Sequence, residues 1–387
     1  MRSDNSKTLY RVLLVEDNEL DIEIVLRCFR HDQLAQVSGA IEISVANCLK
    51  EAFELISKSN FQAILLDLGL PDGTGIEILH KVRKFSSNIP IIILTGNEDD
   101  TLGVEALRSG ADDFLKKSSI SEDTLPRSVR YSIERNFRLL AEAQLHRTQA
   151  EIIAAETIQQ KLLPDFSPEV VDYDIYGACH PAEKIGGDLF DYLSFDDTSC
   201  VGVVADVSGH GLPAAILMTE LHGLLHGLIE QNVSLPRLMS AANIRTDKAT
   251  ESYQFITMIS YHLSAENHSF SYIYAGHPAW ILKGDGTEVV LKSQYLPLGV
   301  DTKKKRLSLT QVRVESGDIL VLPTDGVFEA LGINGERFSV ERMLKEIRNN
   351  KGLSAKEIVH HVLDCAKEFS LDHRLTDDCT LVVIKAC

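Results

Sequence analysis

The chain has few cysteines, and they do not follow a metal-binding or redox spacing. Seven cysteines are scattered through 387 residues without a Cys-x-x-Cys pair, at positions 28, 48, 179, 200, 365, 379 and 387. This scatter disfavours both a disulfide framework and a cysteine-liganded zinc site. We therefore expect reduced thiols and a cytoplasmic protein.

Long hydrophobic runs and an excess of positive charge are also missing. No apolar run reaches the roughly 18–20 residues of a membrane span, and the polar residues 1–7 are unlike a signal peptide. The net charge is −17, whereas nucleic-acid and anionic-membrane surfaces need clustered Lys and Arg. We expect no nucleic-acid partner and no membrane partner, and the lack of a basic recognition helix disfavours a DNA-binding regulator.

What is present suffices for more than one hydrophobic core. Hydrophobic residues make up 44% of the chain, and its length favours two or three domains. Residues 10–120 alternate short apolar runs with amphipathic stretches, which predicts an α/β domain with a parallel sheet and helices on both faces. The expected strands are 12–15, 41–46, 63–66, 91–94 and 113–115, and the expected helices are 20–29, 49–56, 76–82 and 102–108.

Residues 121–163 lack glycine and read as a helical linker. Pro126 lies near the start, where the first turn of a helix tolerates proline, and Pro164 follows the end. A weak heptad seam with 3-4 spacing runs along the segment through Ala141, Leu145, Thr148, Ile152, Ala155, Gln159 and Leu162. Both a single linker helix and a coiled coil that forms a homodimer fit this pattern. We favour the dimer, because a weak seam suits a switch.

Residues 164–387 predict a third region with many strands. The expected strands are 200–205, 255–263, 269–275, 279–283, 319–323 and 380–385, and the expected helices are 213–231, 235–249, 339–349 and 355–369. The pattern indicates a layered α/β/β/α sandwich with mostly antiparallel strands.

A first set of carboxylates stands at the ends of the N-terminal apolar runs. Glu16 and Asp17 follow the first expected strand, and Asp67 follows the third. Carboxylates that meet at one sheet edge repel one another unless a hard cation such as Mg²⁺ joins them, and the Gly69 carbonyl offers a further ligand. Asp67 can then act as a nucleophile toward a phosphoryl group, whose oxygens Lys117 can neutralise.

Residues 10–120 resemble the receiver domains of bacterial response regulators, which have a CheY-like fold. The resemblance implies the strand order 2-1-3-4-5, with Asp67 as the phospho-acceptor, Thr95 as the switch hydroxyl and Phe114 at the aromatic switch position. In the family a lysine lies three residues after the aromatic residue, which selects Lys117. Ser118 stands where the family usually has proline.

A second set of aspartates is spread over the C-terminal region. Asp188 lies in Ile-Gly-Gly-Asp, Asp206 in Ala-Asp-Val-Ser-Gly, Asp325 in Pro-Thr-Asp-Gly, and Asp377 with Asp378 in Thr-Asp-Asp-Cys-Thr. Carboxylates without Cys or His ligands favour Mg²⁺ or Mn²⁺ over Zn²⁺. Two such ions can activate a water and hold a phosphate for in-line attack.

An ordered set of motifs in residues 158–387 resembles the SpoIIE-like branch of the PPM family of metal-dependent Ser/Thr phosphatases. The matching segments are 158–164 (IQQKLLP), 185–191 (IGGDLFD), 205–211 (ADVSGHG), 255–258 (FITM), 274–278 (YAGHP), 296–299 (LPLG), 323–330 (PTDGVFEA) and 376–381 (TDDCTL).

The resemblance implies a role for each carboxylate. Asp188 and Asp206 bridge two ions of Mg²⁺ or Mn²⁺, the Val207 carbonyl is a ligand, and Asp325 and Asp377 complete the site. We prefer Asp377 to Asp378 as the direct ligand, with Asp378 in support. His210 and His277 are expected to form structural hydrogen bonds.

The two resemblances together imply a response regulator whose output is dephosphorylation of a phosphoserine or phosphothreonine protein. The implied partners are a sensor histidine kinase and a phosphorylated anti-anti-sigma (STAS) protein in partner-switching control of a sigma factor. The alternative is a non-enzymatic adaptor that binds a sigma or anti-sigma factor. Such adaptors have degenerate metal sites, whereas all the carboxylates are present here.

Overall fold

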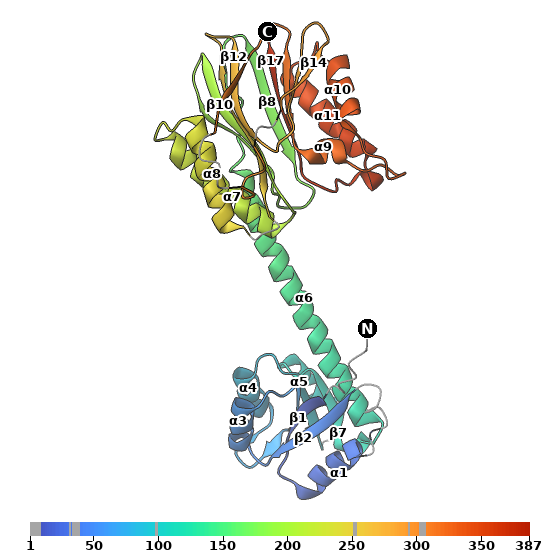
Figure 1. Ribbon diagram of the computed structural model, residues 1–387. Helices are drawn as coiled ribbons and strands as arrows, with labels where there is room; N and C mark the ends of the chain where they lie inside the picture. Colours follow the sequence, from blue (N-terminus) through green and yellow to red (C-terminus); the bar gives the residue numbers. More distant parts are fainter. Residues whose placement is uncertain are drawn as a thin grey trace. The chain divides into compact units, whose positions relative to one another are not determined.

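The computed structural model describes residues 9–30, 32, 39–96, 100–250, 254–292, 295–301 and 307–387, and it divides into two units, residues 1–148 and 149–387 (Figure 1). The first unit contains β1 (Leu9–Val15), α1 (Glu19–Arg30), β2 (Ala40–Ala46), α3 (Leu49–Lys58), β3 (Ala63–Asp67), β4 (Gly69–Leu70), β5 (Gly73–Thr74), α4 (Ile76–Phe85), β6 (Ile91–Thr95), α5 (Asp100–Arg108), β7 (Asp113–Lys116) and the 3-10 helix η1 (Lys117–Ser119).

The first unit is the expected doubly wound domain. Its parallel sheet has the order β2-β1-β3-β6-β7, which confirms the order 2-1-3-4-5 for the five main strands. Alternate side chains of β1 point to opposite faces of the sheet. Leu13 and Val15 pack with α3 and α4 on one face. Val12 and Leu14 pack with α1 and α6 (Thr124–Gln160) on the other. The sheet is therefore buried on both sides.

Helix α6 confirms the long helix expected between the two domains, but its first turns are not a free linker. Leu125, Val129 and Ile133 are buried in the core of the first unit. Arg130 is 9% exposed; its guanidinium binds Asp32 and donates to the Gly39 carbonyl at 2.7 Å. The packing of the first unit thus extends past residue 120, where the sequence predicted its end, while residues 139–150 are exposed.

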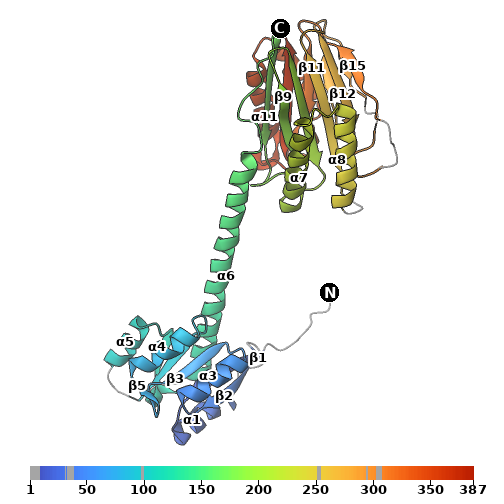
Figure 2. The same cartoon turned by 90° about the vertical axis from the view of Figure 1, so that its left-hand side faces the viewer.

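The second unit is an α/β/β/α sandwich, as expected, and contains β8 (Tyr173–His180), β9 (Leu189–Phe195), β10 (Ser199–Val207), α7 (Leu212–Ile229), α8 (Leu235–Ala249), β11 (Ile256–Ser264), β12 (Ser269–Ala275), β13 (Trp280–Leu282), β14 (Glu288–Val290), β15 (Thr310–Arg313), β16 (Ile319–Pro323), α9 (Asp325–Glu329), α10 (Val340–Asn349), α11 (Ala355–Phe369), η2 (Leu371–His373) and β17 (Cys379–Ala386). Its two antiparallel sheets have the orders β15-β12-β11-β10-β9 and β14-β13-β16-β17-β8. Helices α7 and α8 cover the first sheet, and α9, α10 and α11 cover the second (Figures 1 and 2).

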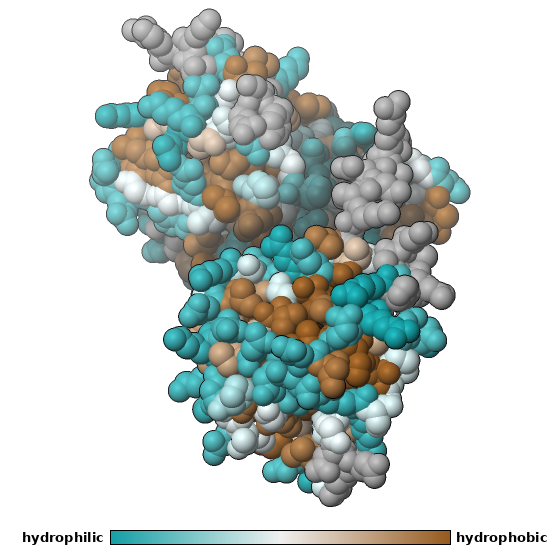
Figure 3. Space-filling model, turned by 90° about the horizontal axis from the view of Figure 1, so that it is seen from below, coloured by the Kyte–Doolittle hydropathy of each residue, from teal (hydrophilic) through white to brown (hydrophobic). Residues whose placement is uncertain are grey.

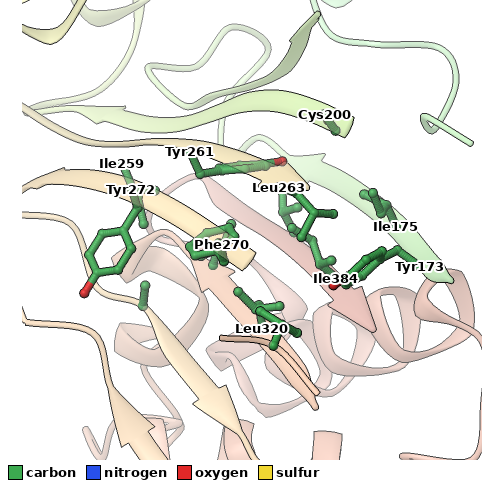
Figure 4. Packing of buried hydrophobic residues seen from close by; sticks show 14 of the residues in the cluster. Tyr173, Ile175, Cys200, Ile259, Tyr261, Leu263, Phe270, Tyr272, Leu320 and Ile384 are labelled. Carbon is green, nitrogen blue, oxygen red and sulfur yellow. The ribbon is translucent and has the colours of Figure 1, made fainter. Parts of the chain in front are cut away.

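Aromatic side chains fill the space between the two sheets. Figure 4 shows Tyr261 and Phe270 from the first sheet beside Leu320 and Ile384 from the second. The rings of Tyr261 and Phe270 are stacked, with centroids 5.2 Å apart. The sequence did not predict β8, β9, β14 or β15. In β9 a carboxylate, Asp191, interrupts the apolar pattern.

Helix α7 differs from the expectation that no stretch of the sequence is long and apolar enough to span a membrane. In the described part of the chain, α7 is long and apolar enough to cross a membrane by length and composition. It packs as a core helix, however, with Ala214, Met218, Leu221 and Leu225 buried against the first sheet. On the face seen in Figure 3, apolar areas alternate with hydrophilic ones.

Candidate functional site

The first carboxylate set lies at the carboxyl ends of parallel strands. Glu16 and Asp17 follow β1, and Asp67 ends β3, so that adjacent strands deliver all three. One ligand atom from each lies within 4.8 Å of the others. Glu16 is 1% exposed and Asp17 is exposed to solvent, so the group is open on one side. A triad of oxygen ligands with this access suits Mg²⁺.

Lys117 enters this cluster from η1. Its Nζ lies 2.7 Å from Oε2 of Glu16, 2.7 Å from Oδ2 of Asp21 and 3.3 Å from Oδ1 of Asp67. Burial alone would lower the pKa of Lys117, but the hydrogen bonds that its ammonium donates to Asp21 and Glu16 raise it above its ordinary value. The ammonium therefore stays charged beside Asp67. Sequence reasoning missed Asp21, which lies on α1 and carries no strand-end signal.

The other predicted receiver residues lie on β6, on β7 and on β4, just after Asp67. Thr95 ends β6, next to β3, and is 5% exposed. Phe114 lies on β7 against α5, where a Cβ added at Gly103 would come within 2.4 Å of its ring. Gly69 donates its N–H to Oδ2 of Asp67 at 3.0 Å, and the ligand role of its carbonyl stays a prediction.

The aspartates of the second set come from both sheets of the second unit. Asp188 directly precedes β9 and Asp206 lies near the end of β10, both in one sheet. In the other sheet Asp325 follows β16, and Asp377 and Asp378 directly precede β17. The carboxylates are close enough to repel one another. The charges of Asp325, Asp377 and Asp378 act on Asp206. The charges of Asp206 and Asp378 act on Asp188.

These carboxylates lie close together at different depths: Asp188 is buried, Asp206 and Asp325 are half-buried, and Asp377 is exposed to solvent. Burial, followed by the repulsion of Asp325, raises the pKa of Asp206 to about 8. Burial also raises the pKa values of Asp188, Asp325 and Asp377. No Lys or Arg forms an ion pair with any of them within the described residues. Divalent cations are the charge that fits such a group, because Mg²⁺ and Mn²⁺ prefer carboxylate oxygens.

The glycines beside the aspartates allow the backbone to come close. A Cβ at Gly187 would lie 3.0 Å from the Val207 carbonyl oxygen, which places that predicted ligand next to Asp188. Asp378 accepts the backbone N–H of Gly187 at 2.6 Å through Oδ2 and that of Ala182 at 2.9 Å through Oδ1. Both carboxylate oxygens of Asp378 therefore accept hydrogen bonds from backbone N–H groups, which is consistent with the supporting role expected for Asp378.

Both histidines named in the sequence analysis contact a polar side chain. Burial lowers the pKa of His277 to about 3, so its ring is neutral, and its Nδ1 lies 2.9 Å from the Thr257 hydroxyl. His210 is exposed, with Nδ1 3.1 Å from Oε1 of Glu183. These contacts agree with the hydrogen-bonding roles expected for both residues.

Two positioning residues escaped sequence reasoning. Thr324 is fully buried; its hydroxyl donates to Oδ2 of Asp188 at 2.7 Å and accepts from the Thr380 N–H at 2.9 Å. Gln159, near the end of α6, holds the Gly186 backbone twice, accepting its N–H at 3.0 Å and donating to its carbonyl at 2.7 Å. Both occur inside motifs noted above, but the sequence assigned Gln159 to a heptad seam.

Comparisons with known proteins match each unit. The family model for the response regulator receiver domain matches residues 12–130, and that for Stage II sporulation protein E (SpoIIE) matches residues 196–386. The phosphoserine phosphatase RsbU of Bacillus subtilis is 30% identical over 241 residues, covering 61% of this chain and 70% of RsbU. The transcriptional regulatory protein PmrA of Pectobacterium parmentieri is 32% identical over 161 residues, covering 42% of this chain and 67% of PmrA.

A solved structure supports the fold of the second unit. The SiaA-PP2C domain of Pseudomonas aeruginosa has a TM-score of 0.53 at 19% identity, covering 63% of this chain and 98% of that domain. Fold and comparisons together define a response-regulator phosphatase, a metal-dependent serine/threonine protein phosphatase joined to a receiver domain. Within that class, the chain belongs to the SpoIIE family.

Proposed function

We propose that two ions of Mg²⁺ or Mn²⁺ are held by Asp188, Asp206, Asp325 and Asp377 with the Val207 carbonyl, and that this site dephosphorylates phosphoserine or phosphothreonine in a protein. The observation that carries the proposal is a group of mutually repelling carboxylates around the buried Asp188, with no Lys or Arg ion-paired to them among the described residues. Bound ions would supply an activated water and bind the phosphate oxygens. The chain's own contribution is to orient the carboxylates, which Thr324 and Asp378 do through the contacts above.

The receiver supplies the proposed input. A sensor histidine kinase would phosphorylate Asp67, with Mg²⁺ held by Glu16, Asp17 and Asp67. Lys117 already lies 3.3 Å from the Asp67 carboxylate and is positioned to contact an added phosphoryl group. Thr95 at the end of the next strand is positioned to sense it. The phosphorylated receiver then shifts the population of phosphatase conformations.

The proposed substrate is a phosphorylated anti-anti-sigma (STAS) protein, and its dephosphorylation would free a sigma factor by partner switching. The similarity to RsbU, named a phosphoserine phosphatase, supports a phosphoserine residue as the target in this substrate. We also propose a cytoplasmic homodimer formed through α6, whose exposed stretch carries Leu139, Leu140 and Leu145.

Substitution of the metal-site carboxylates tests the output. Asp206→Asn and Asp325→Asn should each abolish Mn²⁺-dependent hydrolysis of a phosphorylated STAS protein while thermal unfolding stays cooperative. Asp285→Asn is the matched control, because Asp285 is a fully exposed carboxylate in a loop of the same unit. Full activity of Asp206→Asn would refute the site. Binding of sigma-pathway proteins by a wild-type chain that releases no phosphate would favour the adaptor instead.

Substitution of the phospho-acceptor tests the input. Asp67→Asn should abolish the change in phosphatase rate that an acyl-phosphate donor produces in the wild type, without altering the basal rate. Asp123→Asn, an exposed carboxylate of the same unit, should respond like the wild type. An unchanged response of Asp67→Asn would show that another residue receives the signal.

A further inference from the structure

A second kind of ligand cluster lies away from the proposed phosphatase carboxylates, where α7 crosses β9. Asp191 of β9 and two histidines of α7, His222 and His226, bring one ligand atom each within 4.8 Å of one another. Unlike the carboxylate sets, this group has two nitrogen donors and one oxygen donor. The proposed phosphatase function does not use it.

The strand places Asp191 under the helix. Leu189 and Leu193, two residues to either side, pack in the apolar layer between the first sheet and α7. Asp191 therefore points into that layer, and it is 6% exposed. A carboxylate buried in an apolar layer is costly unless charge or hydrogen bonds compensate it. Its Oδ1 accepts the N–H of Tyr192 at 2.7 Å, which leaves Oδ2 for other partners.

The helix supplies those partners as a chelating pair. His222 and His226 are four residues apart, hence on one face of α7, with ring centroids 4.3 Å apart. Both use the same ring nitrogen: Nε2 of His226 lies 2.6 Å and Nε2 of His222 lies 3.2 Å from Oδ2 of Asp191. Two histidines at this helical spacing, completed by a carboxylate, form a familiar zinc-binding arrangement.

The cluster also has access to solvent. The His222 side chain is 16% exposed and that of His226 is 41% exposed, whereas the carboxylate is covered. An ion held by three protein ligands would thus keep one coordination position for water. Nitrogen and oxygen donors of this kind select a borderline ion such as Zn²⁺ rather than Mg²⁺.

We infer that Asp191, His222 and His226 form a Zn²⁺ site, separate from the phosphatase ions, that fastens α7 to β9. Helix α7 begins at Leu212, directly after the loop that follows Asp206 and Val207. An ion at its third and fourth turns would hold the helix on the sheet and so stabilise the second unit.

Zinc binding by the full chain tests the site. Tag-free, chelator-treated protein is titrated with Zn²⁺ in saturating Mg²⁺, with a chromophoric competitor. The wild type should bind one equivalent of Zn²⁺. His222→Gln and His226→Gln should each weaken that binding by more than the roughly 10–100-fold cost of losing an outer-shell partner. The double variant His361→Gln/Cys365→Ser is the matched control, because Glu346, His361 and Cys365 form another His-containing group with ligand atoms within 4.8 Å.

Two further readouts keep the result interpretable. Zn²⁺ should raise the thermal unfolding temperature of the wild type but not that of Asp191→Asn, a near-isosteric change that also checks folding in the absence of Zn²⁺. Bound Co²⁺ should give visible bands without a thiolate charge-transfer band. Equal Zn²⁺ affinity of the wild type and both histidine variants would overturn the inference, as would a thiolate band lost in the Cys365 variant. Failure of the wild type to bind would show that the cluster is only a hydrogen-bonded network.

Discussion

The contact between Gln159 and Gly186 predicts how the end of α6 acts on the metal site. Gly186 is buried, lies two residues before Asp188, and has both backbone polar groups bound by one side-chain amide. Replacing Gln159 with Ala removes both hydrogen bonds at once. The Gly186 backbone then has to find water or move, and Asp188 is attached to it.

The structure sets the size of the expected effect. Each hydrogen bond contributes about 0.5–1.5 kcal/mol net, so Gln159→Ala should lower the free energy of unfolding by about 1–3 kcal/mol. The catalytic effect should be larger than a stability loss alone explains, because a displacement near 1 Å at a reacting site can cost roughly 100-fold. We expect Mn²⁺-dependent turnover to fall about 10- to 100-fold at temperatures where the variant is fully folded.

Gln160→Ala provides the matched control. The Gln160 side chain is exposed, and within the described residues its side-chain hydrogen bond is a long one, 3.5 Å to Glu156 on the same helix, so its loss should change stability by less than about 0.5 kcal/mol. Urea unfolding and phosphatase rates over a range of Mn²⁺ concentrations compare the two variants. A third variant, Gln159→Glu, keeps the acceptor for the Gly186 N–H but places an oxygen against its carbonyl, and it should resemble Gln159→Ala. Equal turnover of the Gln159 and Gln160 variants would refute the reasoning.

Three more predictions concern other parts of the two sites. Thr324→Val removes the hydroxyl that holds Asp188, so half-maximal activity should need about 10- to 100-fold more Mn²⁺, measured by metal titration; an unchanged requirement would make Thr324 dispensable. Gly103→Ala would place a Cβ 2.4 Å from the ring of Phe114, so thermal unfolding of the receiver should occur at lower temperature and the response to an acyl-phosphate donor should weaken, while the basal phosphatase rate stays unchanged. For pH dependence, burial and repulsion by Asp325 raise the pKa of Asp206 from 3.8 to about 8, so the metal-free fold keeps a proton that the unfolded chain has already released. This contribution to stability is present below about pH 4 and is lost as pH rises toward 8, so urea unfolding with chelator should show lower stability at pH 8 than at pH 5, and Mg²⁺ or Asp206→Asn should reduce the difference.

Much of the fold was predictable because both units follow strong periodic signals. The central strands β3 and β6 are continuous buried runs, as in a parallel sheet covered on both faces. All five strands of the parallel sheet were expected to within three residues of their observed ends, whereas the two-residue strands β4 and β5 were not expected. The missed strands lack that signal for physical reasons. Strand β9 carries Asp191 in its apolar layer, and β14 is short and exposed on both faces.

The candidate sites were predictable in their carboxylates but not in the groups that position them. An aspartate at the end of an apolar run is visible in sequence, whereas its hydrogen-bond donor can come from anywhere in the chain. Thr324 is 136 positions from Asp188, and Asp21 approaches Lys117 from 96 positions away. Only the folded structure brings such pairs together.

The structure also narrows where a dimer seam on α6 can lie. The expected seam ran from Ala141 to Leu162. At its C-terminal end, Gln159 is fully engaged with Gly186, and Leu162 packs against the core beneath α7. These two positions therefore serve the second unit itself. A partner helix has exposed positions to pack against between Ala141 and Thr148, so a charge introduced at Leu145 should weaken self-association more than one introduced at Leu162, whose main effect should be on the stability of the phosphatase unit.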